Sequence, residues 1–258
     1  MRIEMASELA SRYHSPSQRA RVVSEFWAGE NLYCPCCDAD RLHATRTNTK
    51  VLDYTCALCK SPFQLKASRS RFGKRVLDGA FTVLREAILS NNTPNLLLLH
   101  YNRERWLVQS LTFIPWFAFT LSCVERRPPL SNSAQRALYV GCNILLCNIP
   151  LDARVQMVCE GEVVNPSTVR KKFRALKPIA HLTPIQRGWT LDVLNSVRGL
   201  EKEEFTLDEV YASSGQLQAL HPNNKHVTAK IRQQLQRLRD FGYLRFVSPG
   251  RYRLLQNS

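Results

Sequence analysis

Two CxxC pairs constrain the fold of this chain more than any other feature. Cys34 and Cys37 form the first pair and Cys56 and Cys59 the second, with eighteen residues between Cys37 and Cys56. A two-residue gap lets both thiolates of a turn point at one ion, and this spacing is typical of a zinc ribbon. The pattern therefore predicts that Zn²⁺ ties the two turns together as a structural cofactor.

Two alternatives to this zinc site stay open. Cys36 lies inside the first turn and could replace Cys37 as a ligand. The four thiols could also be unconnected cysteines of a reduced compartment. The nine cysteines are not arranged as a secreted disulfide framework, and the first twenty residues are too polar for a signal peptide. Residues 107–124 contain several polar side chains and a proline, which indicates buried strands and not a membrane span. We therefore expect a cytoplasmic protein.

The charge of the chain points to a polyanionic partner. Lys and Arg number 36 against 21 Asp and Glu, a net charge of +15. Such an excess is typical of nucleic-acid binding, because each cation that meets a phosphate releases a counterion. A merely basic protein is the alternative. The excess is concentrated at the C-terminus: residues 183–223 hold three basic and six acidic side chains, and residues 224–258 hold eight basic and one acidic.

Helix breakers between Leu176 and Gly188 predict a domain boundary near residue 182. Residues 1–182 then form an α/β domain with a central mixed sheet, and residues 183–258 a small α+β domain. In the first, we expect helices over 15–27 and 79–90, with Asp78 as the N-cap of the second. The expected strands are residues 50–55, 63–66, 95–100, 154–159 and parts of 106–119.

The C-terminal domain has the element order of a winged helix. We expect helices over 190–199, with Thr190 as N-cap, over 207–211 and over 226–241, followed by a hairpin within 243–255. In this helix-turn-helix variant the last helix enters the major groove. Arg and Gln side chains suit the edges of guanine and adenine. The expected DNA-binding residues are Lys225, His226, Lys230, Arg232, Gln233, Gln236 and Arg237 on and before this helix, and Arg251 on the hairpin.

Asp53, Gln64 and Lys66 have the layout of a PD-(D/E)XK nuclease core. An acid lies on one strand, and an oxygen ligand and a lysine alternate on the next, so both point to one side of the sheet. Oxygen ligands can hold Mg²⁺, which activates a water for phosphodiester hydrolysis, and the lysine can orient that water. The motif is short, and strands without function can match it. Residues 60–75 carry six basic and no acidic side chains, so Arg69 and Arg71 are expected to contact phosphates, with a solvated basic loop as the alternative. His43, His100, His181 and His221 have no ligand-like partners and are interpreted as structural.

Many ordered blocks give the chain a family resemblance along nearly its whole length. It resembles the DpnI family of methyl-directed restriction endonucleases. The matching blocks are Ser17-Gln18, Ala20-Arg21, Trp27, Tyr33-Cys34-Pro35, Cys37, Cys56, Cys59, Leu65-Lys66, Asp78-Gly79-Ala80, Asn92 to Asn95, Arg136-Ala137, Gly141-Cys142-Asn143-Ile144, Arg187-Gly188-Trp189-Thr190, Glu204-Phe205-Thr206-Leu207, Lys230 to Gln236 and Leu238-Arg239-Asp240.

The resemblance implies a PD-(D/E)XK catalytic domain with a zinc site, followed by a winged helix. It implies that both domains bind double-stranded GATC with 6-methyladenine on both strands and that the enzyme cuts there with Mg²⁺. Asp53, Gln64 and Lys66 match the family's catalytic positions, and the four cysteines match its zinc positions. Two residues depart from the family: its glutamate is Gln64 here, and its tryptophan after the Arg136-Ala137 block is Tyr139. Arg136 and Tyr139 are expected to contact DNA, with Tyr139 beside a methyl group.

Three functions fit these observations. The first is a methylation-dependent endonuclease that is monomeric in solution and cuts the two strands in succession. The second is a reader that binds methylated GATC without cutting, because Gln64 replaces the carboxylate. The third is a zinc-ribbon transcription factor with a winged helix, which leaves Asp53 and Lys66 without a role.

Overall fold

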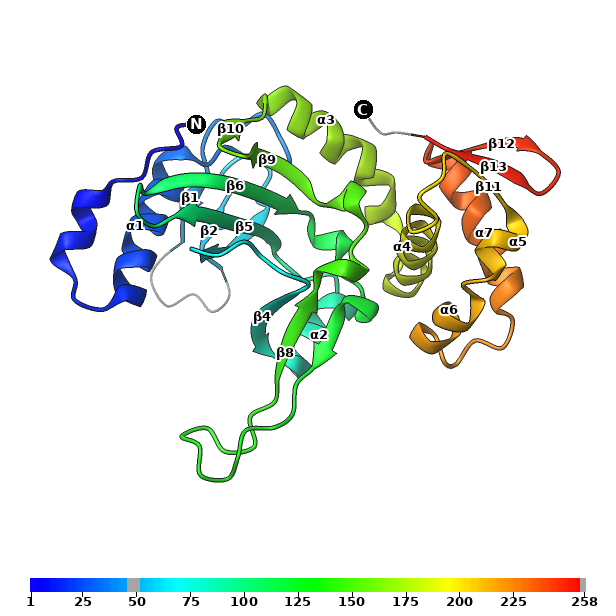
Figure 1. Ribbon diagram of the computed structural model, residues 1–258, viewed down its shortest axis with the longest axis horizontal. Helices are drawn as coiled ribbons and strands as arrows, with labels where there is room; N and C mark the ends of the chain where they lie inside the picture. Colours follow the sequence, from blue (N-terminus) through cyan, green and yellow to red (C-terminus); the bar gives the residue numbers. More distant parts are fainter. Residues whose placement is uncertain (46–51, 256–258) are drawn as a thin grey trace. The chain divides into compact units, whose positions relative to one another are not determined.

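The structure, a computed structural model, describes residues 1–45 and 52–255 and divides the chain into two compact units (Figure 1). Each unit is assembled from three stretches that alternate along the chain. Unit 1 comprises Met1–Gly73, Thr93–Trp116 and Ala153–Ala175, and unit 2 comprises Lys74–Asn92, Phe117–Asp152 and Leu176–Ser258. The domain boundary expected near residue 182 stays a prediction, because these units follow three-dimensional contacts and not the order of the chain.

Unit 1 is built around a seven-stranded sheet. Its order is β1-β2-β3-β5-β6-β9-β10, and β3 and β5 pair in parallel whereas the other pairs are antiparallel. The predicted mixed sheet is therefore confirmed. The strands are β1 (His43–Ala44), β2 (Tyr54–Thr55), β3 (Pro62–Ser68), β5 (Asn95–Asn102), β6 (Leu107–Ile114), β9 (Val155–Cys159) and β10 (Glu162–Val163), and the helices are η1 (Ser7–Arg12), α1 (Pro16–Asn31) and α3 (Pro166–Leu176).

The core of unit 1 lies along β5. Leu96 to Leu99 are all buried, which is why this strand shows no alternation of apolar and polar residues. The fully buried amide of Asn95 joins the neighbouring segments: its Nδ2 donates to the Pro62 carbonyl at 2.9 Å, and its Oδ1 accepts from the Trp116 N–H at 3.0 Å. The amide thereby fixes the start of β5 against the start of β3. Part of the predicted 50–55 strand, residues 50 and 51, lies outside the described residues.

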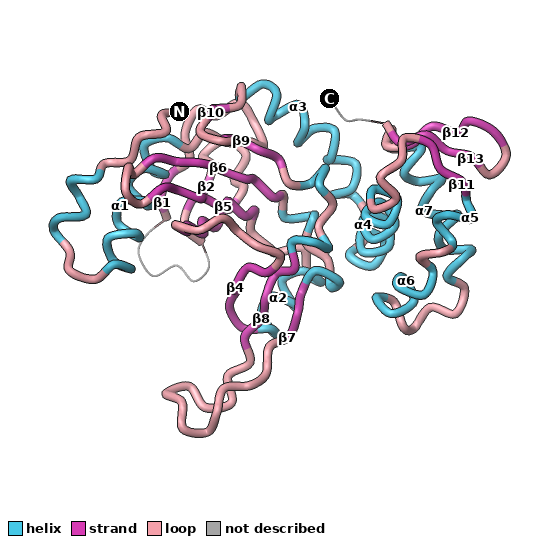
Figure 2. The backbone as a smooth tube through the Cα atoms, viewed as in Figure 1, coloured by secondary structure: helices cyan, strands magenta, loops and turns pink. Residues whose placement is uncertain are grey.

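Unit 2 contains a small antiparallel sheet and the C-terminal elements. The sheet has the order β4-β8-β7, from β4 (Arg75–Ala80), β7 (Val124–Arg126) and β8 (Gly141–Leu145), and α2 (Phe81–Leu89) follows β4 directly. Residues 127–140 form an irregular loop that extends away from the ends of β7 and β8 (Figure 2). Short 3-10 turns occupy Trp116–Ala118, Leu121–Cys123, Leu146–Asn148 and Leu151–Ala153.

The C-terminal elements form the predicted winged helix. A three-stranded sheet of order β11-β13-β12 accompanies four helices, of which α6 was not predicted. A 3-10 turn, Lys177–His181, precedes them. The elements are α4 (Pro184–Arg198), β11 (Glu204–Thr206), α5 (Leu207–Tyr211), α6 (Ser214–Leu220), α7 (Val227–Asp240), β12 (Leu244–Ser248) and β13 (Arg251–Leu254).

Two helix starts differ from the sequence predictions. Helix α4 begins at Pro184, with Thr183 and Gln186 in a reciprocal capping box, and Thr190 lies buried inside the helix. Proline at the first helical position lacks an N–H that would be unpaired there in any case, so it starts this helix and does not break it. Asp78 is a residue of β4 paired with Cys142, and Ala80 is the N-cap of α2, so the N-cap role predicted for Asp78 is wrong.

The apolar stretch over 107–124 supplies β6 and two of the short 3-10 turns. Among the helices of the described residues, none combines the length and apolarity needed to cross a membrane.

Candidate functional site

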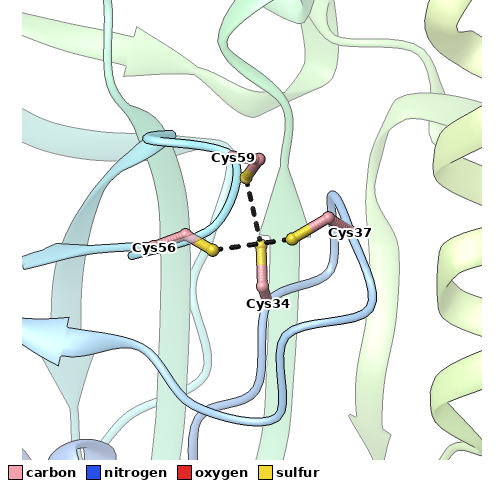
Figure 3. A group of neighbouring side chains, drawn as sticks. All are labelled: Cys34, Cys37, Cys56 and Cys59. Atoms are coloured by element: carbon pink, nitrogen blue, oxygen red, sulfur yellow. Dashed lines mark hydrogen bonds between the residues drawn. The ribbon is translucent and has the colours of Figure 1, made fainter.

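The four cysteines of the two CxxC pairs converge on one point in unit 1. The first turn follows α1, and the second joins β2 to β3. All four Sγ atoms lie within 4.8 Å of one another, with 3.6 Å between Cys34 and Cys59 and 3.5 Å between Cys37 and Cys56 (Figure 3). The predicted grouping of these four residues is confirmed. Within the described part of the chain, this group does not include Cys36.

This cluster fits zinc by its donor chemistry and by its dimensions. A tetrahedral ion with bonds of about 2.3 Å to sulfur holds its four ligands about 3.8 Å apart. The two observed sulfur–sulfur distances are close to that value, so a zinc ion needs little rearrangement. Burial raises the pKa of the Cys59 thiol, but hydrogen bonds with Ser61 and the neighbouring thiols more than offset this and bring it to about 7. The four residues can thus form a structural metal site.

An arginine of α3 holds the first cysteine turn in place, and the sequence analysis did not identify it. Arg170 donates from Nε to the Cys34 carbonyl at 3.2 Å and from Nη2 to the Ala39 carbonyl at 3.0 Å. Its guanidinium also lies over the ring of Tyr33, 5.3 Å from the centroid. Arg170 comes more than 130 residues after the turn, so no local pattern in the sequence could indicate the contact.

Asp53 forms hydrogen bonds with the backbone of both residues that flank Gln64. It directly precedes β2, and its N–H donates to the carbonyl of Phe63 at 3.0 Å. Its Oδ2 accepts a hydrogen bond from the N–H of Leu65 at 2.7 Å. Gln64 and Lys66 alternate on β3 and therefore share one face of the sheet, while Phe63 is fully buried on the other. The acid is thus attached to the strand that carries the other two predicted residues.

The electrostatic surroundings of Asp53 come from β3 and α1. Burial raises the pKa of this carboxyl, and the charge of Glu25 raises it further. The Leu65 N–H and the positive charges of Lys66 and Arg21 act in the opposite direction. Tyr54, the next residue, donates its hydroxyl hydrogen to the carbonyl of Glu25 at 2.9 Å, which ties α1 to this part of the sheet. A half-buried carboxylate is the kind of group that can hold a hard cation.

Arg69 and Arg71, both members of the basic run over residues 60–75, directly follow the end of β3. Both side chains are exposed. His100 of β5 lies beside them: burial lowers its pKa, the charge of Arg71 lowers it further, and a hydrogen bond to the Arg69 backbone partly offsets both.

The long loop of unit 2 carries Arg136 and Tyr139. The Tyr139 N–H donates to the Arg136 carbonyl at 3.1 Å, and the Tyr139 carbonyl accepts from the Leu130 N–H at 3.0 Å. The ring is half-buried beside Gly141, where a Cβ would lie 3.4 Å from its Cε1, while Leu138 is 67% exposed. Arg136 is exposed. The loop therefore presents a cation and apolar side chains together.

The residues of α7 that are predicted to contact DNA fall into an exposed group and a group bonded within the protein. Arg232, Gln233 and Gln236 are exposed, and Arg232 packs against Tyr211 of α5, 5.6 Å from the ring centroid. Arg237 instead donates from Nη1 to the Oε1 of buried Gln234 at 2.8 Å. Lys230 donates to Gln233 at 2.8 Å. Lys225 and His226 are exposed just before the helix, and Arg251 is exposed on β13.

A helix-turn-helix domain with an exposed polar helix, in a chain of net charge +15, defines a DNA-binding protein. Two family models agree with this class. The model of the Dam-replacing family, DpnI, matches residues 1–181, and the model of the Dam-replacing helix-turn-helix domain matches residues 185–254. The chain belongs to the DpnI family, which implies a restriction nuclease, and the resemblance found in the sequence is confirmed.

Proposed function

We propose that this protein is a methylation-dependent restriction endonuclease of the PD-(D/E)XK type, which cuts double-stranded DNA at GATC sites carrying 6-methyladenine. The observation that carries the proposal is the attachment of Asp53 to β3 at Leu65, between Gln64 and Lys66, in a member of the DpnI family. This attachment supports the proposal because it holds an acid, an amide and a lysine on neighbouring positions of one strand.

The side-chain oxygens of Asp53 and Gln64 are hard donors and fit Mg²⁺. When bound, Mg²⁺ polarises the phosphoryl group and promotes ionisation of the attacking water. Asp53 supplies the negative charge, since the amide of Gln64 is neutral. Lys66 orients the water and stabilises the negative charge that develops on the phosphoryl oxygens.

Recognition in this proposal is divided between the two family regions. The exposed face of α7 reads base edges in the major groove, with Arg232, Gln233 and Gln236 as readers and Arg251 on a phosphate. The 6-methyl of adenine adds apolar surface in that groove, and burying it beside a ring contributes about 1 kcal/mol. Tyr139 is the ring assigned to this contact. The enzyme acts as a monomer and cuts the two strands in succession.

The test uses one plasmid prepared with and without adenine methylation at GATC, incubated with the purified protein and Mg²⁺ at low salt. We expect cutting of the methylated form alone, into the fragments of a GATC digest. Cutting of both forms, or of neither, contradicts the proposal.

A second function, a reader that binds methylated GATC without cutting, is favoured by one observation: the family's glutamate is Gln64 here. It predicts a methyl-dependent gel shift on the same DNA with no cleavage at any Mg²⁺ concentration. The zinc-ribbon transcription factor gives neither cleavage nor methyl dependence, so the same pair of assays separates all three functions.

A further inference from the structure

A polar cavity of about 580 Å³ lies in unit 1 at the end of β3, the strand that carries Gln64 and Lys66. It is formed where β3 ends, where β5 turns into β6, and along the start of β6. The seven residues that line it are Arg69, Ser70, His100, Asn102, Arg103, Glu104 and Gln109.

The cavity is on the same face of the sheet as Gln64 and Lys66. In the parallel pairing of β3 with β5, Lys66 is opposite Leu98 and Ser68 is opposite His100. Side chains two residues apart on a strand share a face, so His100 and Asn102 point to the side of Lys66. At about 3.3 Å per residue, His100 is displaced from the level of Lys66 by about 7 Å along the strand. This is a displacement that one nucleotide step along a DNA strand can span.

Two arginines from different segments line this cavity. Arg69, just after β3, and Arg103, in the β5–β6 turn, are both exposed. Among the described residues, neither Arg69 nor Arg103 takes part in an ion pair, and Glu104 is the one carboxylate of the lining. Ser70, Asn102 and Gln109 add neutral hydrogen-bonding groups. The lining therefore suits an anion with several acceptor oxygens.

The backbone that carries these arginines is held by specific contacts. The His100 side chain hydrogen-bonds to the backbone of Arg69. In the β5–β6 turn, the Oδ1 of Asn102 accepts from the N–H groups of Glu104 and Arg105, both at 2.9 Å. Tyr101 and Trp106 stack across the same turn, with centroids 5.4 Å apart. The turn is thus braced on both sides of Arg103, so the cavity does not depend on a free loop.

We propose that this cavity binds a backbone phosphate of the cut DNA strand, adjacent to the scissile phosphate, with Arg69 and Arg103 as its cationic ligands. The inference rests on the proposed nuclease function and extends it to a DNA contact outside Asp53, Gln64 and Lys66. The lining offers no aromatic ring besides the imidazole of His100 on which a base could stack. A phosphate, which requires converging donors and no ring, is the part of DNA that matches it.

The experiment measures binding of a methylated GATC duplex in Ca²⁺, in place of Mg²⁺, for the wild type, Arg103→Gln and Arg105→Gln. Arg105 is the matched control, because it is exposed in the same turn and does not line the cavity. Each phosphate near the cut site is replaced, one at a time, by an uncharged methylphosphonate. We expect one replacement, next to the scissile phosphate, to weaken binding several-fold in the wild type and in Arg105→Gln but not in Arg103→Gln. The slope of log Kd against the logarithm of the salt concentration should also decrease by about 0.9, and only in Arg103→Gln.

The inference is overturned if every methylphosphonate weakens Arg103→Gln as much as it weakens the wild type, or if the two variants lose affinity alike. A second contrary outcome is that inorganic phosphate binds the wild type and not Arg103→Gln, while every methylphosphonate affects the two proteins equally. The cavity would then bind a free anion and not a phosphate of the DNA backbone. An unchanged thermal transition of Arg103→Gln, and retention of the coupling in Arg103→Lys, separate the loss of a ligand from misfolding. Cutting of methylated plasmid by the wild type without such coupling leaves the proposed nuclease intact and removes this inference alone. Failure of the wild type to bind the duplex removes both.

Discussion

The carboxylate of Asp53 accepts a 2.7 Å hydrogen bond from the backbone N–H of Leu65. Leu65 stands between Gln64 and Lys66, so the backbone of the strand itself positions the acid. The contact explains how a residue outside a regular strand can be held beside two residues within one. It also makes the three predicted catalytic residues a single unit that mutations can test separately.

Replacing Asp53 by Asn should abolish cleavage and leave methyl-dependent binding intact. The Asn amide oxygen can still accept from Leu65, so we expect no loss of thermal stability. Burial raises the pKa of the Asp53 carboxyl, and the charged form is the one that attracts Mg²⁺. Mg²⁺ affinity in the wild type should therefore decline on acidification from a pH higher than an ordinary aspartate would give. Cleavage rates against Mg²⁺ at several pH values measure this, and residual cutting by Asp53→Asn would contradict the assigned role.

Replacing Gln64 by Glu should lower the Mg²⁺ concentration needed for half-maximal cutting. A carboxylate adds a charge that an amide lacks, and a gain on the order of tenfold corresponds to about 1.4 kcal/mol. Gln156→Glu, an exposed position on β9, adds the same charge elsewhere in unit 1 and serves as the control. Equal Mg²⁺ dependence in all three proteins would mean that residue 64 does not coordinate the ion.

Removing zinc should unfold unit 1 and not merely slow the reaction. The cysteine cluster joins the turn after α1 to the turn between β2 and β3, and metal binding at such sites contributes folding free energy directly. Cys56→Ser should abolish the thermal transition of this unit, whereas Cys159→Ser, an exposed cysteine outside the cluster, should not. A chelated protein that keeps its full calorimetric transition would contradict a structural zinc.

Two glutamines of α7 should respond in opposite ways. Gln236 is exposed, so Gln236→Ala should weaken binding of the methylated site by about 1–3 kcal/mol with no change in stability. Gln234 is fully buried and accepts hydrogen bonds from Thr190 at 2.9 Å and Arg237 at 2.8 Å. Gln234→Ala should lower the free energy of unfolding by about 1–3 kcal/mol, because Arg237 loses its acceptor in Gln234 and Thr190 keeps only the Gln186 carbonyl. Thermal denaturation and DNA titration of the two variants, side by side, check the contrast.

Replacing Tyr139 by Ala should reduce the preference for methylated over unmethylated DNA. Loss of apolar contact with one methyl group, about 1 kcal/mol, corresponds to roughly fivefold in relative affinity. Tyr139→Trp places a larger ring at this position and should retain the preference. If Tyr139→Ala cuts and discriminates like the wild type, the methyl groups are read elsewhere.

Features that depend on neighbouring residues could be predicted from the sequence. The cysteine turns, α7 and the C-terminal hairpin each arise from spacing within a short segment, and the structure contains all of them. The alternation of Gln64 and Lys66 on a strand is also local. The start of α4 was predicted wrongly because Pro184 was treated as a helix breaker, although Thr183 and Gln186 make it a start.

Features that depend on distant segments could not be predicted. The parallel pairing of β3 with β5 brings His100 beside the end of β3, and nothing near His100 in the sequence indicates that position. Arg170 reaches the first cysteine turn from α3 in the same way. The catalytic roles, the GATC specificity, the monomeric state and the cytoplasmic location stay predictions.

The interleaving of the two units limits how recognition can be exchanged between relatives. Within unit 2, Asp152 pairs with Arg198, Ser122 donates to Asp192 at 2.6 Å, and the Cys147 carbonyl accepts from Asn195 at 3.0 Å. A chimera joined near residue 182 inherits one half of each pair from each parent. Homologous recombination that preserves this unit has to move residues 74–92, 117–152 and 176–255 as a set. New specificities therefore arise more readily by point substitution on α7 and the 127–140 loop than by exchange of a C-terminal segment.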